Sequence, residues 1–382
     1  MLPSQRAHFD IPADVAYLNA AAWSPLPRAT QEAAQAAVLR KGQPWKIGPD
    51  FADAQHERAR EAAAALIGAE AGDVALVSSV GYGVAIAGKV LSVPRGARVL
   101  VLENDHTSPV LEWMSRAEPQ GFTVEAIAPA ADGDWTSAVL EAIERPGAPP
   151  LALASISSVH WSDGGILDLP AIRDALRRQG AAFLLDATHS VGVIATDVRT
   201  LDPDFLIFPT YKWVLGPYGR AFVYVAKRHH DGMPLEQTSF GRRNVKAESP
   251  VYFSDTRYLP DARRYDMGER DHFISMEMAS IGMEMMSSWG ARAVVERLAE
   301  LTRRISDGVA NLNVRRPDDR FRAPHILSLG FSGDTLNRLI PALAREKVYV
   351  AARLGRMRVS PHVYNDESDV DRFIASMTSA MA

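Results

Sequence analysis

The chain has 382 residues, of which 47% are hydrophobic and 23% are charged, and it carries a formal net charge of -4 with a sequence pI near 6.2. This length predicts two or three domains, or one large domain with a smaller companion. The net charge gives no basic surface for nucleic acid, and no apolar run approaches the ~20 residues of a membrane span. The absence of cysteine excludes disulfides, thiolate metal sites and cysteine nucleophiles, and no metal site of another kind is predicted.

The N-terminal residues are polar and contain prolines. Residues 1–15 are expected to form an arm that lies on another surface, and they lack the pattern of a signal peptide, so we expect a cytoplasmic protein without a membrane partner. Residues 17–27, YLNAAAWSPLP, predict a short edge strand that ends at a proline, or part of a binding site. Alanine-rich segments at 30–40 and 51–67 have the amphipathic spacing of helices, and Gly68 ends the second.

Short apolar runs bounded by turn signals recur through the first two thirds of the chain, and they are typical of buried strands in a parallel sheet. The runs are VALV, RVLVL, FTVEAI, PLALASI, AAFLL, FLIF and AFVYVA. The first run is followed by the turn VGYG and a helical stretch. Because backbone N–H groups at a helix N-terminus carry partial positive charge, this turn is a candidate phosphate cradle.

Two of these runs stop at a charged residue. The run in FLLDATHSVG ends at Asp186, and the run in DFLIFPTYKW leads through three residues to Lys212. Since the carboxyl ends of parallel strands are where such sheets hold ligands, both charges are expected at one site. A lysine and a carboxylate in one crevice are the groups that pyridoxal 5'-phosphate (PLP) chemistry requires, the lysine as Schiff base and Asp186 as partner of the pyridine nitrogen.

The sequence changes character after the last of these strands. Residues 228–264 are polar and have no clear period, which predicts a long loop region at the site. A methionine-rich helix follows, and it is expected to pack against the core or a partner subunit. Alternating helical and strand-like pieces up to the C-terminus predict a smaller α+β domain. We therefore expect an arm at 1–15, a large PLP-binding domain at 16–265 and a small domain at 266–382.

Together, FLLDATHSVG, DFLIFPTYKW and the late segment MRVSPHVYN resemble the class V aminotransferase family of fold-type I PLP-dependent enzymes. This family includes cysteine desulfurases, isopenicillin N epimerase and kynureninase, and the resemblance covers nearly the whole chain. It implies an α/β fold of the PLP-dependent transferase type, with a seven-stranded, mainly parallel sheet in the large domain. It also implies a homodimer whose active sites are shared between the subunits.

The resemblance assigns candidate contacts to the cofactor ring. His106 falls where the family places a histidine that stacks on the ring, with Ala187 on the opposite face. The family's asparagine that hydrogen-bonds the ring is absent, and Ser158 or His160 is expected to replace it. His189 stands where desulfurases have a glutamine that hydrogen-bonds the phenolic oxygen, and it is also able to carry a proton.

A second set of candidates surrounds the cofactor phosphate. Val80, Gly81 and Tyr82 match the family's phosphate loop, although the family usually has threonine in place of the tyrosine. The family has a phosphate-binding serine at the position of Pro209. Because proline has no hydrogen-bond donor, Thr210 is expected to take this role. Arg270 is expected to reach the phosphate of the neighbouring subunit, with a surface arginine as the alternative.

The substrate contacts implied by the resemblance come from the two ends of the chain. Residues Asn19 to Ala22, which include Ala21, are candidates to bind the substrate carboxylate. Arg358 lies in the signature Arg-x-Ser-Pro-His-x-Tyr-Asn, and its planar guanidinium offers two parallel hydrogen bonds to that carboxylate. The expected small-molecule partner is an amino acid.

These residues imply a reaction in which the substrate displaces Lys212 to form an external aldimine, and the freed lysine, its pKa lowered, removes the alpha proton. Without cysteine, desulfuration is excluded. Transamination is the expected outcome; beta-elimination from an S-substituted cysteine by a C–S lyase is the alternative, and racemisation and decarboxylation stay open. A non-catalytic binding module is the alternative of another class. A dinucleotide-binding dehydrogenase is excluded because Ile86 occupies the place of the third glycine in its turn.

Overall fold

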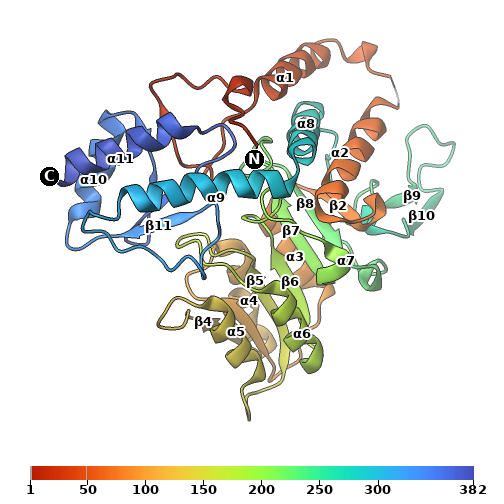
Figure 1. Cartoon of the computed structure of the whole chain (residues 1–382). Coiled ribbons are helices and arrows are strands. Elements are labelled where there is room, and N and C mark those ends of the chain that lie inside the picture. The colour runs from red at the N-terminus through yellow and green to blue at the C-terminus, as the bar shows by residue number, and fades with distance from the viewer. Residues whose placement is uncertain (1, 49) are drawn as a thin grey trace.

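The computed structural model describes residues 2–48 and 50–382, and its centre is a seven-stranded sheet (Figure 1). The strand order is β2-β8-β7-β6-β5-β3-β4. Six strands run in one direction, and β8 is antiparallel to both of its neighbours. The strands are β2 (Val74–Val77), β3 (Arg98–Leu102), β4 (Thr123–Ile127), β5 (Leu151–Ser157), β6 (Ala182–Asp186), β7 (Phe205–Pro209) and β8 (Ala221–Val225). The predicted seven-stranded, mainly parallel sheet is confirmed.

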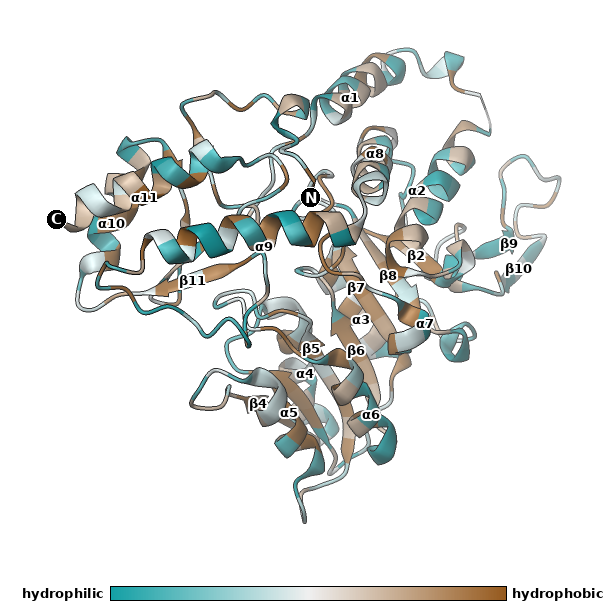
Figure 2. Cartoon of the chain, viewed as in Figure 1, coloured by the Kyte–Doolittle hydropathy of each residue, from teal (hydrophilic) through white to brown (hydrophobic). Residues whose placement is uncertain are grey.

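Helices cover both faces of this sheet, which explains why its strands are apolar without alternation. On one face lie α3 (Val80–Val90) and α4 (Thr107–Gln120), and on the other lie α5 (Trp135–Glu144) and α6 (Leu169–Gln179), followed along the chain by the short α7 (Val198–Leu201). Figure 2 shows the strands as the apolar centre between these layers. The rigid sheet therefore fixes the positions at which its carboxyl-end loops begin.

The two predicted N-terminal helices are present as α1 (Arg28–Lys41) and α2 (Phe51–Ile67). Gly68 ends the second with a φ of 68°, a left-handed conformation that glycine adopts without steric cost. Both helices pack against α8 (Phe273–Trp289). This is the methionine-rich helix, and its buried methionines confirm the expected packing against the core; they are Met276, Met278, Met283 and Met286.

The C-terminal part forms a smaller α+β unit, as expected. An antiparallel sheet has the order β11-β14-β13. Its elements, with the surrounding helices, are α9 (Ala291–Gly308), β11 (Leu327–Gly330), α10 (Thr335–Arg345), β12 (Val348–Tyr349), β13 (Ala351–Arg353), β14 (Arg356–Val359) and α11 (Glu367–Met381).

The N-terminal residues lie against this C-terminal part. Strand β1 (Ala16–Tyr17) pairs in parallel with β12, and Arg6 forms an ion pair of 2.8 Å with Asp369 of α11. The segment that follows β1 is thereby brought beside β14, through a bridge between Asn19 and Ser360. The domain boundaries drawn from the sequence remain a prediction.

The polar stretch at 228–264 contains a small antiparallel pair of strands, β9 (Arg242–Asn244) and β10 (Asp255–Tyr258). Within the part of the chain that the structure describes, no residue of this stretch lines the cavity that holds Lys212. No helix among the described residues has both the length and the apolar character needed to cross a bilayer.

Candidate active site

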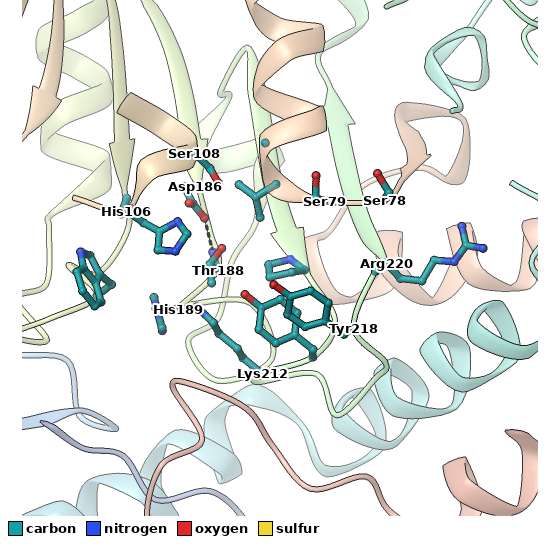
Figure 3. Close-up of a pocket in the computed structure, with 17 residues that line it drawn as sticks. Ser78, Ser79, His106, Ser108, Asp186, Thr188, His189, Lys212, Tyr218 and Arg220 are labelled. Carbon is teal, nitrogen blue, oxygen red and sulfur yellow. Dashed lines mark hydrogen bonds between the residues drawn. The ribbon is translucent and has the colours of Figure 1, made fainter. Parts of the chain in front are cut away.

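A cavity lies at the carboxyl ends of the parallel strands, where the loops after β2, β3, β5, β6 and β7 meet (Figure 3). Parallel strands in one sheet end at the same edge, so side chains far apart in sequence converge there. Six of the candidates named from the sequence line this cavity: Val80, Gly81, His106, Asp186, His189 and Lys212.

Asp186 is the last residue of β6, and it is 3% exposed. Its Oδ1 accepts a hydrogen bond of 2.9 Å from the backbone N–H of Thr188. No described residue donates to Oδ2. One carboxylate oxygen is thus fixed by the backbone, while the other is free to accept a hydrogen bond from a ligand.

Lys212 follows β7 and is 7% exposed. Its Nζ lies 3.4 Å from Nε2 of His189, and among the described residues it forms no ion pair with a carboxylate. Burial, and next to it the positive charge of Arg358, lower the pKa of the Lys212 amine to about 7, although Asp186 opposes this change. A substantial fraction of this amine is therefore neutral near neutral pH, as a nucleophile or a base must be.

This pKa predicts the pH dependence of cofactor uptake. Only the neutral amine attacks an aldehyde, so we expect the rate at which the apoprotein takes up PLP to rise about tenfold from pH 6 to above pH 8 and then level off. Stopped-flow absorbance of the bound cofactor measures this rate. A rate that still rises between pH 9 and pH 10, as for a solvated lysine, would contradict the lowered pKa.

His106 lies at the start of α4 and lines the cavity beside Trp161, with ring centroids 6.1 Å apart. Its backbone N–H donates to the carboxylate of Asp105, at 2.7 Å. Partial burial and the nearby charge of Lys212 lower the pKa of His106. A neutral imidazole at this place is suited to stacking on an aromatic ring.

The N-terminus of α3 forms one wall of the cavity. Ser79 caps this helix, because its Oγ accepts a hydrogen bond of 3.1 Å from the backbone N–H of Tyr82. The N–H groups of Val80 and Gly81 lie in the first turn, where a helix offers no carbonyl partner. Both residues line the cavity, and an anion such as a phosphate fits this place.

Several candidates lie outside the cavity lining. The Ser158 hydroxyl donates to Oγ of Ser190 at 2.9 Å. His160 is held between Asp163 and the carbonyl of Glu103, with both contacts at 3.1 Å. Neither side chain faces the cavity, whereas the neighbouring Ser157 does.

Thr210 and Ala187 are also outside the lining. The Thr210 hydroxyl donates to the carbonyl of Pro217 at 2.6 Å, which closes the loop after Lys212. Ala187 is fully buried, and Thr188 lines the cavity in its place. Side chains at the end of a strand alternate in direction, so the residue two positions after Asp186 shares its side.

Tyr82 and Arg270 have other surroundings within the chain. The Tyr82 hydroxyl is buried without a hydrogen-bond partner among the described residues. Arg270 forms an ion pair with the buried Asp266 and lies 4.9 Å over the ring of Phe240. A contact of Arg270 with a second subunit remains a prediction.

The proposed carboxylate clamp lies beside the cavity. Arg358, on β14, is 1% exposed, and its Nη1 donates to the carbonyl of Trp161 at 2.6 Å. It forms no ion pair within the described part of the chain, and its Nε has no partner. Burial and the charge of Arg353 lower the pKa of the Arg358 guanidinium to about 9. A buried cation without a counter-charge favours an anionic ligand.

The N-terminal candidates adjoin this arginine through Ser360. Among the described residues, the buried Oδ1 atom of Asn19 has no partner, and the backbone N–H of Ala21 donates to Oγ of Ser360 at 3.1 Å. The open Nε of Arg358 is a donor that suits a carboxylate, whereas the open Oδ1 of Asn19 accepts a hydrogen bond and suits an N–H or O–H group.

Sequence reasoning missed several residues that line the cavity. Thr188 was detectable, because it lies two positions beyond Asp186. Arg220, at 3% exposure, gave no signal; it donates through Nε to Ser275 at 2.7 Å, while its Nη1 has no partner in the described ranges 2–48 and 50–382. Trp161 and Tyr218 also line the cavity, and neither belongs to a recognisable motif.

The residues present fit PLP part by part. Lys212 would supply the amine for the aldehyde, Asp186 a free carboxylate oxygen for the pyridine nitrogen, and the first turn of α3 donors for the phosphate. Figure 3 shows Lys212, Asp186 and His106 on one side of the cavity, with Ser79 and Ser78 toward α3.

The fold and this site define a PLP-dependent enzyme of fold type I. The chain belongs to the class-V aminotransferase family, whose model matches residues 16–373. This finding confirms the resemblance drawn from the sequence motifs.

Individual relatives are distant but match over most of their length. An uncharacterized aminotransferase, YcbU of Bacillus subtilis, is 27% identical over 91% of this chain and 88% of its own. A probable cysteine desulfurase of Pyrococcus abyssi is 24% identical over 85% and 82%. The apo structure of a cysteine desulfurase from Thermococcus onnurineus superimposes with a TM-score of 0.84 at 20% identity, covering 98% and 97% of the two chains, which shows the shared fold.

Proposed function

We propose that this protein is a PLP-dependent aminotransferase that acts on an amino acid. One observation carries the proposal: a buried, uncompensated Arg358 lies beside a cavity that holds Lys212 and Asp186. When bound, PLP supplies an electron sink for the negative charge left on the substrate carbon. Arg358 binds the substrate carboxylate, Lys212 takes and returns the proton, and Asp186 holds a proton on the ring nitrogen by hydrogen bonding.

The absence of cysteine separates this proposal from the activity named for several relatives. A desulfurase needs a thiolate to accept sulfur, and this chain has none. Beta-elimination from an S-substituted cysteine needs no thiol from the protein, so it is the second candidate. A binding module without catalysis has no need of a neutral buried lysine.

Absorbance and product analysis test the proposal. Purified protein with PLP is expected to show a visible band that borohydride bleaches. Amino acids are then screened for keto acid release with and without an added keto acid acceptor. Release that depends on the acceptor supports transamination, release without it supports elimination, and a protein that never binds PLP would overturn both.

We further propose that the protein is a cytoplasmic homodimer in which Arg270 reaches the phosphate site of the second subunit. Within the chain Arg270 pairs with Asp266, which also pairs with Arg60. The Asp266 carboxylate therefore keeps a counter-charge when Arg270 moves to the second subunit. Sedimentation of the PLP-loaded protein tests the dimer, and a fully active monomer would refute the role of Arg270.

A further inference from the structure

His189 lies between two functional neighbours, Lys212 and Trp213. Its ring is 3% exposed, and its two nitrogens have different partners. Nε2 faces the amine of Lys212 at 3.4 Å, on the cavity side. Nδ1 accepts a hydrogen bond of 2.9 Å from Nε1 of Trp213.

The contact with Trp213 determines the tautomer of His189. An indole nitrogen always donates and never accepts a hydrogen bond, so Nδ1 must present a lone pair. A neutral imidazole with an unprotonated Nδ1 carries its hydrogen on Nε2. The nitrogen that faces the cavity is therefore an N–H donor, with no lone pair available to take a proton.

Protonation of His189 to the imidazolium is also opposed. A hydrogen on Nδ1 would point at the indole N–H, so the bond to Trp213 would be lost. Burial is the main cause that holds the pKa of His189 well below its ordinary value. The positive charges of Lys212 and Arg358 lower this pKa further, and His325 and His106 contribute less.

Trp213 is itself held rigidly. Its side chain is 1% exposed, and its ring centroid lies 4.4 Å from that of His325 in an edge-to-face contact. His325 contacts the backbone carbonyl of His189 through Nε2 at 2.8 Å, and His362 contacts the carbonyl of Trp213 through Nε2 at 3.2 Å. Two histidines from the C-terminal part therefore fix both partners of the hydrogen bond.

We propose that Trp213 is a positioning residue that locks His189 as a hydrogen-bond donor toward the cavity, so that proton transfer at the reacting atoms falls to Lys212 alone. This rests on the proposed function. In each turnover Lys212 removes one proton from the substrate carbon and returns one proton, while His189 keeps its own hydrogen throughout. His189 thus acts as a glutamine amide would, and it is not a second base.

Nitrogen NMR of the apoprotein tests the lock without any turnover. In histidine-labelled wild-type protein, His189 is expected to show an unprotonated Nδ1 and a protonated Nε2 from pH 8 down to pH 5.5, with the resonance assigned by its loss in His189→Gln. In Trp213→Phe, the Nδ1 signal is expected to shift, because the tautomer of His189 is no longer fixed by the indole N–H. A wild-type His189 that is protonated on Nδ1, or an unchanged tautomer in Trp213→Phe, would overturn the proposal.

Two substitutions of His189 test the donor role in the loaded enzyme. His189→Gln retains an N–H donor and is expected to keep the rate of alpha-hydrogen exchange with solvent within about threefold, whereas His189→Ala is expected to lose about tenfold or more. A glutamine variant as slow as the alanine variant would show that His189 transfers protons and would sink the idea. If no amino acid exchanges its alpha hydrogen even in the wild type, the proposed function fails, and the NMR result still decides whether the lock exists.

Discussion

Replacement of Lys212 by alanine is expected to lower the rate of amino acid turnover by about 10³-fold or more and to remove the visible band that borohydride bleaches. The proposed function gives Lys212 two tasks, to bond the cofactor covalently and to move the substrate proton. Loss of a general base alone costs about 10²–10⁴-fold. No other lysine lines the cavity among the described residues, so no neighbour replaces the amine.

The matched control is Lys227→Ala, which removes an exposed lysine that, within the described part of the chain, forms an ion pair only with the surface residue Glu70. This variant is expected to retain the absorbance band and full turnover. Both variants are compared by absorbance, by borohydride trapping with mass analysis of the labelled peptide, and by keto acid release. A Lys212→Ala protein that still forms a reducible adduct on a specific lysine would assign the Schiff base to another residue.

The sequence predicted the sheet and its two charged ends because those features depend on local patterns. Asp186 and Lys212 each follow a short apolar run, and the direction of parallel strands brings their ends together. The turn at Val80 and Gly81, which lines the cavity, was predictable for the same reason, since a strand, a turn and a helix follow one another directly; its role as a phosphate site stays a prediction.

The surroundings of these residues were less predictable, since they depend on which way each side chain points. Ser157 lines the cavity and Ser158 does not, although the two are adjacent. The same one-residue difference separates Thr188 from Ala187. The hydrogen bond from Trp213 to His189 was not predictable from the sequence. The two residues follow different strands, and only the tertiary fold brings them together.

Replacement of Arg358 by alanine is expected to raise the KM for amino acids by about 30-fold or more, with little change in the affinity for PLP. The guanidinium is buried and has no carboxylate partner among the residues that the structure describes, so it is available to pair with the substrate carboxylate. Removing one partner of a buried, hydrogen-bonded charge pair costs about 2–5 kcal/mol. Arg358→Lys keeps the charge but loses the two parallel hydrogen bonds, and an intermediate KM is expected.

The same substitution is expected to shift the pH profile. The charge of Arg358 helps to lower the pKa of Lys212, so its removal makes the lysine easier to protonate and raises that pKa above about 7. Because turnover needs the neutral amine, the acidic limb of the profile then moves to higher pH.

Arg353→Ala is the control, since the charge of Arg353 also lowers the pKa of Lys212 although this side chain is only partly buried. It is expected to move the acidic limb slightly and to leave KM unchanged. If Arg353→Ala raised KM and Arg358→Ala left it unchanged, the carboxylate clamp would have to be assigned to β13 instead of β14.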